Sequence, residues 1–431
     1  MSGNIYPPTG DGAVRNGHEG NKRLSGPDAW RRLGWRAAIT AGAYVTAALV
    51  VVLTFLALKG RVEPRVLQAL LGYFFIASLS AGLEPGTIKA AALSGPGVAV
   101  DLGAALAASI IKGLAASPIL ALVWRFADPH IDGAVLAWTP GLCVAGFAAT
   151  DLRVLFDLEG RHATAIWVKQ GALAAGLAIV AALAWLRVPL AAGVAVSTLA
   201  RLAFVAAIGA ALVARRKTRI GTPSAPLAPR LAGLFADRRW MELAGASLVA
   251  AISGSTDRVF GLRYLSAEAW AGYYLLYEVF SKFWFLPYLL GPIVFARRLA
   301  DGPGSRFGRA VGRLIGAVGL LFVAAVVGAI ALAPRLPIAG LHLVLGAPTV
   351  AFAAAVVTAS FTQVRIAQLQ GAGASRRVLA AMSLGAALAA ALFFVGARQF
   401  GVTGLMVAWL IKAAVELGTV TLAARVSPRV A

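Results

Sequence analysis

Asp157-Leu158-Glu159-Gly160 and Gln368-Leu369-Gln370-Gly371 stand 211 positions apart in a chain of 431 residues, and the match continues from there without a gap. The further pairs at this offset are Leu173 and Leu384, Arg187 and Arg398, Gly193 and Gly404, Leu199 and Leu410, and Arg201 and Lys412. A repeat this long exceeds the roughly 20 to 50 residues of solenoid units. Duplicated bundles that face each other across a central site are typical of secondary transporters.

The composition identifies the medium in which the chain folds. Hydrophobic residues make up 59% of it, charged residues only 13%, and the mean hydropathy is +0.79. A soluble domain needs more polar surface than this chain can supply. Apolar runs long enough to cross a hydrocarbon core recur along its length. Inside lipid, backbone groups must be hydrogen-bonded within their own segment, which predicts helices, and the runs are too uniformly apolar for a β-barrel.

We therefore predict an all-α polytopic membrane protein of about twelve transmembrane helices, in two repeated six-helix bundles around a central cavity. Residues 1–29 are predicted to be a disordered cytoplasmic tail, 30–214 the first bundle, 215–239 a cytoplasmic linker and 240–431 the second bundle. The predicted spans are 37–58, 66–88, 99–123, 134–156, 165–186, 190–213, 241–262, 270–295, 310–333, 344–369, 378–395 and 402–423.

The basic residues predict the orientation. The net charge is +22, and with the amino terminus inside, Lys and Arg of the inner segments outnumber those of the outer loops by roughly three to one. This bias places both termini in the cytoplasm. It accounts for much of the positive charge as a contact with anionic membrane lipids, so we expect no nucleic-acid partner.

Four cations fall near the middle of predicted spans: Lys112, Arg201, Lys282 and Lys412. A charge that faces lipid there costs at least about 2.5 kcal/mol, so such side chains normally face the bundle interior or a wet cavity. Glu278 precedes Lys282 by one turn and Glu416 follows Lys412 by one turn, so these two cations have a local ion pair as an alternative to a cavity role. Lys112 and Arg201 have no acid within a turn. Central cations outnumber central acids, which indicates an anionic substrate.

The eighth span carries Tyr274, Tyr277, Glu278, Ser281 and Lys282 along one face at helical spacing. Phenol rings beside an ammonium and a hydroxyl suit a sugar or a phosphate headgroup, and an aromatic packing stripe is the structural alternative. In the seventh span, Asp257 and Arg258 form either a gate-like pair or an interfacial charge cluster.

Other chemistry is missing from the sequence. The four His residues show no metal-ligand spacing, the lone Cys143 lies in an apolar stretch, and no nucleotide-binding glycine loop is present. We therefore expect no metal, no cofactor and no catalytic residue, and a transporter in place of an enzyme. No predicted outer segment is long enough for the external catalytic loop of a membrane glycosyltransferase or ligase.

Several stretches resemble one family. Asp257-Arg258-Val259-Phe260-Gly261-Leu262-Arg263-Tyr264-Leu265-Ser266, followed by Ala271-Gly272-Tyr273-Tyr274, is similar to the seventh and eighth helices of bacterial polysaccharide flippases. Leu158-Glu159-Gly160 and Leu369-Gln370-Gly371-Ala372-Gly373, each followed by an apolar helix and then Gly193 or Gly401-Val402-Thr403-Gly404, resemble their fourth-to-sixth and tenth-to-twelfth helices. Ser80-Ala81-Gly82-Leu83 resembles the end of their second helix.

This family is the Wzx-like branch of the multidrug/oligosaccharidyl-lipid/polysaccharide (MOP) exporters. The resemblance implies a flippase that moves a polyprenyl-diphosphate-linked oligosaccharide across the bacterial inner membrane by alternating access, beside polysaccharide polymerase and assembly proteins. It does not carry over the four cations, which rest on their depth in the spans. The main alternative is a cation-coupled antiporter of drugs or metabolites with the same fold, for which Asp257, Glu278 and Glu416 are the candidate coupling carboxylates.

Overall fold

The computed structural model describes residues 49–58, 60–83, 102–158, 162–214, 248–284, 306–332, 346–371 and 374–425, together with isolated positions at 39–46, 245 and 286–294. Within these ranges the regular elements are helices. The predicted tail, 1–29, and the predicted linker, 215–239, lie outside the described residues. The helices are α3 (Pro64–Gly82), α5 (Leu102–Ala127), α6 (Gly133–Leu136), α7 (Thr139–Leu158), α8 (His162–Trp185), α9 (Leu190–Ala214), α12 (Thr256–Tyr264), α13 (Ala267–Ser281), η1 (Lys282–Trp284), α15 (Arg306–Leu332), α16 (Ala347–Gly371) and α17 (Ser375–Arg425).

The fold class predicted from the sequence is confirmed. Eight of the described helices are long and apolar enough to cross a membrane, and a shorter apolar helix covers Leu49–Leu58. Each predicted span from the second to the sixth and from the ninth to the twelfth has a helix at its place. The first and the seventh spans are described only in part, the seventh by residues 248–253 and α12, and the eighth contains α13 and η1.

The eleventh and twelfth spans meet at Gly401, within α17. Gly401 has a φ of 61° and a ψ of −138°, which an L side chain rarely adopts and a glycine tolerates. A Cβ atom on Gly404 would lie 2.2 Å from the carbonyl oxygen of Gly396. In one straight helix these residues would be about 12 Å apart, since each residue advances the helix by about 1.5 Å. The chain therefore doubles back at Gly401, and the helix before it continues past the predicted end at Val395.

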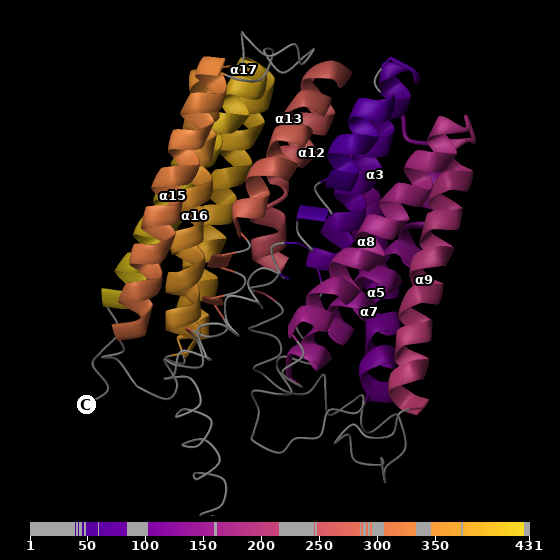
Figure 1. The fold of residues 1–431 in the computed structure, drawn as a ribbon, viewed down its shortest axis with the longest axis horizontal. Coiled ribbons are helices and arrows are strands. Elements are labelled where there is room, and N and C mark those ends of the chain that lie inside the picture. Colours follow the sequence, from indigo (N-terminus) through magenta and orange to yellow (C-terminus); the bar gives the residue numbers. More distant parts are fainter. Residues whose placement is uncertain are drawn as a thin grey trace, which may run out of the picture.

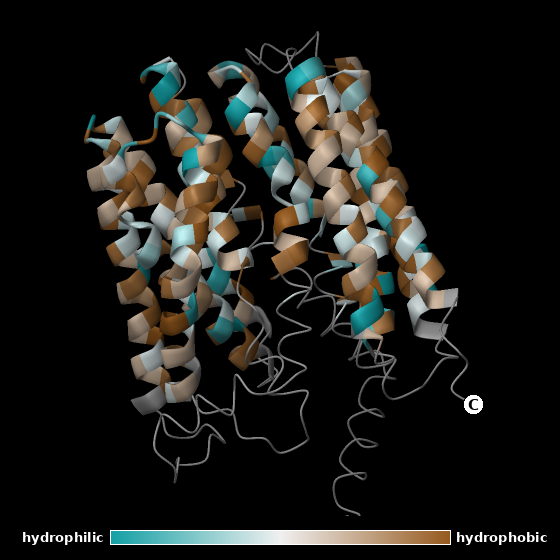
Figure 2. Ribbon diagram, turned by 180° about the vertical axis from the view of Figure 1, so that it is seen from behind, coloured by the Kyte–Doolittle hydropathy of each residue, from teal (hydrophilic) through white to brown (hydrophobic). Residues whose placement is uncertain are grey.

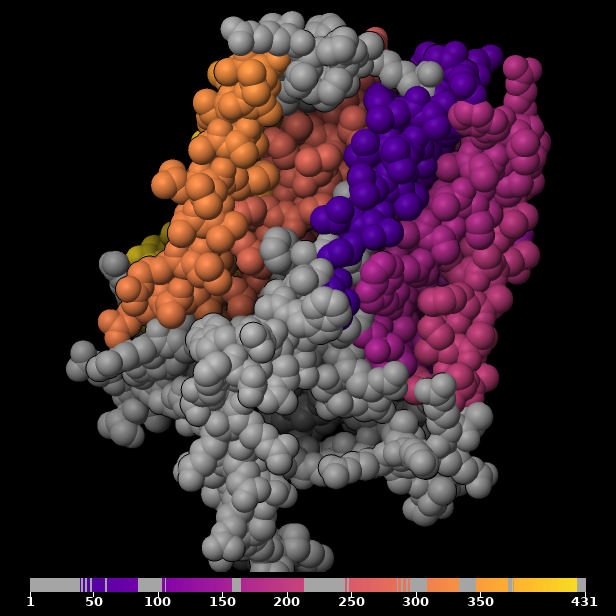
Figure 3. Space-filling view, in the orientation of Figure 1, coloured from indigo at the N-terminus to yellow at the C-terminus, as the bar shows by residue number. Residues whose placement is uncertain are grey.

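The helices form two groups, which we call the first half (α3 to α9) and the second half (α12 to α17). In Figure 1, α15, α16 and α17 stand on one side, α5, α7, α8 and α9 on the other, and α3, α12 and α13 lie between them. Contacts between the halves run mainly from α13 to α3 and from α12 to α5. Figure 3 shows the surface of α3 beside that of the α12–α13 segment. The centre of the molecule is thus formed by helices from both halves.

One hydrophobic cluster extends through both halves. It contains Tyr73 of α3 and Trp124 of α5 together with Trp270 of α13, Phe352 of α16 and Trp409 of α17. The outward faces are apolar too: Leu122, Leu320 and Leu321 are each at least 70% exposed. Figure 2 shows hydrophobic positions over the length of the helices with isolated hydrophilic ones among them. Apolar side chains that point outward suit a hydrocarbon environment, so the polar positions inside carry the functional information.

Candidate functional site

Eight charged side chains are buried in the described parts of the helices. Burial of an isolated charge is costly, so each of these side chains needs a partner or a function. The eight are Lys112, Asp151, Arg201, Asp257, Arg258, Glu278, Lys412 and Glu416.

Lys112 of α5 is paired with an acid from a neighbouring helix. Its Nζ lies 3.1 Å from Oδ2 of Asp151 on α7, and the hydroxyl of Ser109 donates a hydrogen bond to the same oxygen. Gly113 allows the two helices to approach, since a Cβ there would lie 2.8 Å from the backbone of Val144. Asp151 was not predicted as the partner of Lys112, because it lies on a different helix and not within one turn of Lys112 on the same helix.

Among the described residues, no carboxylate forms an ion pair with Arg201 of α9. Its side chain is 3% exposed, and its Nε and Nη1 have no hydrogen-bond acceptor among the described residues. The stem of the side chain lies over Gly176 of α8, where a Cβ atom would be 2.7 Å from Cδ of Arg201. One turn earlier, Ser197 donates to the carbonyl of Gly176 at 2.8 Å and shares a 2.6 Å hydrogen bond with the hydroxyl of Tyr73. The guanidinium is therefore held by packing, with donors that nothing in the described protein uses.

Asp257 lies at the start of α12 and is completely buried. Its Oδ2 accepts hydrogen bonds from the hydroxyl of Tyr273 at 2.5 Å and from the indole nitrogen of Trp409 at 2.9 Å. These donors come from α13 and α17, so the carboxylate joins three elements of the second half. Its Oδ1 lies 3.6 Å from Nε of Arg258. Both members of the pair are thus buried inside the protein.

Arg258 connects the two halves. Its guanidinium carbon lies 4.2 Å from the ring centre of Tyr277 on α13 and 5.0 Å from that of Phe75 on α3. Its Nη2 donates to the hydroxyl of Ser255 at 3.2 Å and to the carbonyl of Gly254. A cation between two aromatic faces away from water is attracted to both rings. Arg258 is therefore a buried cation in contact with aromatic rings of both halves.

The predicted face of the eighth span is divided between an ion pair and an aromatic cluster. Lys282 lies 2.7 Å from Oε2 of Glu278, and the hydroxyl of Ser281 donates to the backbone carbonyl of Glu278 at 3.1 Å. Tyr277 packs near Trp284, Phe352 and Trp409, with ring centres about 6 Å apart. Tyr274 is fully buried beside Trp270. In this conformation both tyrosines pack against aromatic rings of the second half.

Lys412 has the other pair that the sequence allowed. Its Nζ lies 2.9 Å from Oε2 of Glu416, and Ser253 donates to the other oxygen of Glu416 at 2.9 Å. A Cβ atom on Gly385 would lie 2.7 Å from Cγ of Glu416, so glycine leaves the room that this acid occupies. The ammonium also lies 4.6 Å from the ring centre of Trp409. Both oxygens of the carboxylate are therefore engaged.

Three of the four predicted cations, Lys112, Lys282 and Lys412, are each paired with a separate carboxylate in this conformation. Lys112 and Arg201 belong to the first half, and Lys282 and Lys412 to the second. Each buried carboxylate of the described chain has a Lys or Arg within 4 Å: Asp151, Asp257, Glu278 and Glu416. Among the buried cations of the described residues, Arg201 is the one without a carboxylate within 4 Å. A desolvated guanidinium with free donors is suited to bind an anion, above all a carboxylate or phosphate.

Within the described ranges, no three His, Cys, Asp or Glu side chains form a group that could hold a metal ion. The polar interior is instead built from ion pairs, hydroxyls and aromatic rings.

Comparison with known proteins relates the chain to membrane transporters through its fold. No protein-family model matches the sequence, and no curated protein matches it. Solved structures do match. A mutant of the Vibrio cholerae MATE transporter VcmN superposes with a TM-score of 0.61 at 13% identity, covering 92% of this chain and 96% of that one. The eukaryotic MATE transporter AtDTX14 gives a TM-score of 0.58 at 13% identity, with coverage of 92% and 96%.

A third similar structure is a MOP superfamily transporter from Pyrococcus furiosus, described as having a binding pocket of reversed polarity that suggests a different function. It gives a TM-score of 0.57 at 14% identity and covers 90% of this chain and 93% of that one. These similarities extend over nearly the whole of each chain. The protein therefore has the fold of the MATE transporters of the MOP superfamily, and it is a multi-span membrane protein of a transporter fold.

Proposed function

We propose that this protein transports an anionic, lipid-linked substrate, and that it flips a polyprenyl-diphosphate-linked oligosaccharide across the bacterial inner membrane by alternating access. The observation that carries the proposal is Arg201, a buried guanidinium whose Nε and Nη1 have no acceptor among the described residues. A buried charge without a partner destabilises the folded protein by roughly several kcal/mol, and a role in binding an anion would explain why this one is kept.

The carboxylates support an anionic substrate over a cationic one. A cationic drug or a coupling ion needs an acid that it can reach, and the four buried acids of the described chain are each within 4 Å of a Lys or Arg. An anion can bind Arg201 without displacing an existing ion-pair partner, because Nε and Nη1 of Arg201 have no acceptor among the described residues. A diphosphate can accept two parallel hydrogen bonds from one guanidinium, which gives affinity and orientation together.

The proposal includes a conformational step, because Arg201 is buried and its helix α9 packs against α3, α7 and α8. During transport these helices would open toward the space between the halves. Lys112, Lys282 and Lys412 could then bind the diphosphate only if their ion pairs with Asp151, Glu278 and Glu416 were broken. Arg258, between Phe75 and Tyr277, would leave the interface when the halves separate. Tyr274, Tyr277 and Ser281 keep their predicted role as sugar contacts for that open state.

The test is a flipping assay with the purified protein in liposomes and a fluorescent polyprenyl-diphosphate oligosaccharide on one leaflet. Arg201→Ala should lose at least about tenfold in rate, since a hydrogen bond to a charged group contributes about 1.5–3 kcal/mol. Arg201→Lys should keep part of the activity. The matched control is Arg398→Ala, which changes an exposed arginine of the second half. Full activity of a correctly folded Arg201→Ala protein would refute the proposal.

The second candidate is a cation-coupled antiporter, which the similarity to MATE transporters favours. In that case Asp257, Glu278 or Glu416 would bind the coupling ion. A sodium or proton gradient should then drive export of a cationic dye from the same liposomes, and Glu278→Gln should abolish it. For the flippase, Glu278→Gln should leave measurable transport if Glu278 only neutralises Lys282. Assembly with polysaccharide polymerase proteins belongs to the flippase proposal and would follow from it.

A further inference from the structure

A cavity of about 810 Å³ opens at one end of the first half. It is lined by the connection before α3, the segment between α5 and α7, and the turn between α8 and α9. The distribution of Lys and Arg predicts that both termini are cytoplasmic, and these three connections then lie on the opposite, outer face of the membrane. None of Lys112, Arg201, Lys282 and Lys412 is among its lining residues. The cavity is therefore separate from the buried charges described above.

Its inner wall is aliphatic. Val135, Val180 and Ala184 are buried there, and Val66, Leu190 and Ala191 continue the same surface. No Phe, Tyr or Trp side chain is among the described residues that line it. A sugar or a nucleobase is usually bound by stacking on an aromatic ring, whereas an aliphatic wall suits a hydrocarbon chain. The volume falls in the range of roughly 300–1,000 Å³ that is usual for small-molecule sites.

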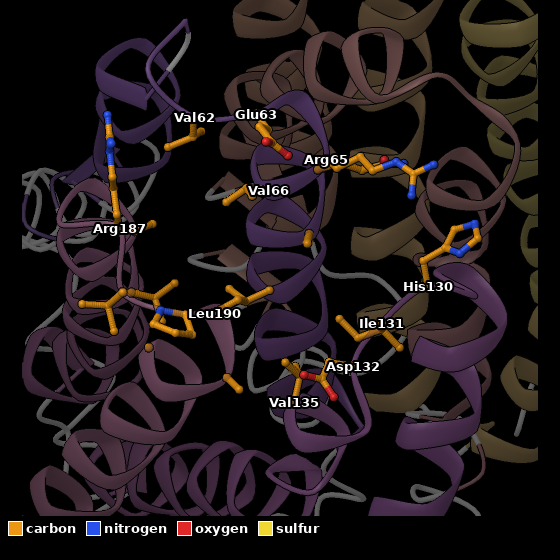
Figure 4. A pocket seen from close by; sticks show the side chains of 18 of the residues that line it. Val62, Glu63, Arg65, Val66, His130, Ile131, Asp132, Val135, Arg187 and Leu190 are labelled. Carbon is orange, nitrogen blue, oxygen red and sulfur yellow. The ribbon is translucent and has the colours of Figure 1, made fainter.

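The rim has both signs of charge in equal number. Three arginines and three carboxylates line the cavity: Arg61, Arg65, Arg187, Glu63, Asp128 and Asp132. In the described structure none of these six forms an ion pair with another. Figure 4 shows Arg187 on one side of the pocket, Arg65 and His130 on the opposite side, and Glu63 between them.

The three carboxylates differ in whether they already accept hydrogen bonds from the backbone. Asp128 accepts a hydrogen bond from the backbone N–H of His130 at 3.1 Å, and Asp132 accepts one from Ala134 at 2.9 Å at the start of α6. Glu63 precedes α3 and makes no side-chain hydrogen bond to its backbone. Arg61 is stacked 4.0 Å from the ring centre of Trp185. Glu63, Arg65 and Arg187 are consequently the groups most available to a ligand.

We infer that this cavity binds a zwitterionic lipid, with its phosphate on the arginines, its ammonium on Glu63 and part of its chain on the aliphatic wall. Opposite charges that stand around one cavity without pairing are complementary to a ligand that carries both signs. Arginine is suited to the phosphate, and a carboxylate to the three donors of a primary ammonium. A phosphoethanolamine headgroup on an aliphatic chain has this chemistry. The inference is independent of what the protein transports.

The test measures binding of dihexanoyl phosphatidylethanolamine to the purified full-length protein by the fluorescence of tryptophan. Phosphatidylglycerol with the same chains serves as the anionic comparison, and phosphoethanolamine without chains tests the aliphatic wall. We expect phosphatidylethanolamine to bind at least tenfold more tightly than either. The charge-neutral variants are Arg65→Gln with Arg187→Gln, which should weaken both lipids, and Glu63→Gln, which should weaken phosphatidylethanolamine alone.

The matched control is Arg398→Gln, because Arg398 occupies the position equivalent to Arg187 in the second half, is exposed and does not line the cavity. Its affinity for both lipids should equal that of the unchanged protein. Equal affinity for phosphatidylethanolamine and phosphatidylglycerol, or unchanged binding by Glu63→Gln, would overturn the inference and identify the rim as ordinary charges at the membrane surface. Unchanged thermal melting of the variants establishes that they are folded.

Discussion

Arg201 and Lys412 occupy equivalent positions in the two halves, and the difference between their surroundings lies one turn further along each helix. In the second half Glu416 is 2.9 Å from Lys412, and Ser253 holds the same acid. The residue equivalent to Glu416 in the first half is Val205, which is buried in a hydrophobic cluster. The two helices are built alike, and one side chain decides whether the cation is neutralised. The repeat therefore preserves the scaffold while the charge differs.

The turns between the last two helices of each half differ as well. In the first half the chain reverses through Leu186 to Pro189, with a φ of 59° at Arg187, and this turn lines the cavity. In the second half it reverses at Gly401, and Gly396 lies against Gly404. Gly193, the equivalent of Gly404, has only ordinary contacts at 3.6 Å or more. The first half is thus looser at the end where the cavity opens.

The largest expected effect comes from giving the first half the carboxylate of the second. Val205→Glu places an acid one turn after Arg201, in the arrangement of Lys412 and Glu416, and should neutralise the free guanidinium. Flipping in liposomes should fall at least about tenfold, because the substrate then competes with an internal carboxylate for charge-assisted hydrogen bonds. Val205→Gln has a similar shape without the charge and should retain most of the activity. Equal rates for the two variants would contradict the role assigned to Arg201.

The converse change should affect stability. Glu416→Val leaves Lys412 buried, 4% exposed and without its carboxylate. Removal of one partner of a buried ion pair typically costs about 3–5 kcal/mol, so thermal melting in detergent should shift clearly downward. In the double variant Glu416→Val with Lys412→Met both charges are gone, and most of the stability should return. If the double variant melted as early as the single one, the loss would come from packing and not from the unpaired charge.

Features that repeat along the chain could be predicted from the sequence, whereas contacts between different helices could not. Apolar runs and the 211-residue offset act along the chain, so the helices and the pairs Glu278–Lys282 and Glu416–Lys412 could be predicted. Asp151 beside Lys112 and Phe75 beside Arg258 could not, because each contact joins different helices. The rotation of each helix about its axis decides which side chains meet, and it is set by packing. Gly113 and Gly176 take part in this packing, but the sequence alone does not show which helix approaches them. The cavity at the end of the first half depends on three separate connections and was missed for the same reason.

A smaller effect is expected where the second half is packed most closely. Gly404→Ala puts a methyl group 2.2 Å from the carbonyl oxygen of Gly396, which must move. Overpacking of this kind typically costs about 1–3 kcal/mol. Gly193→Ala, at the equivalent position, has Val180 at 3.6 Å and should melt as the unchanged protein does. Equal melting temperatures for the two variants would mean that the hairpin of the second half is no tighter than that of the first.

The smallest effect concerns the turn of the first half, and its sign is the informative part. Arg187 has a positive φ, which costs a residue with a side chain roughly 1–2 kcal/mol relative to glycine. Glycine at this position gains flexibility in the unfolded chain, which offsets about 0.5–1 kcal/mol of that relief. Without lipid, Arg187→Gly should therefore be slightly stabilising, by about 0.5 kcal/mol, in thermal melting. Arg398→Gly, inside a helical stretch, should instead destabilise by about 0.5–1 kcal/mol.

Opposite signs from the same substitution at equivalent positions would separate the strained turn beside the cavity from the helical hairpin of the second half. If Arg187→Gly were as destabilising as Arg398→Gly, the arginine would hold the turn through contacts of its side chain, and the cavity rim would owe its shape to them.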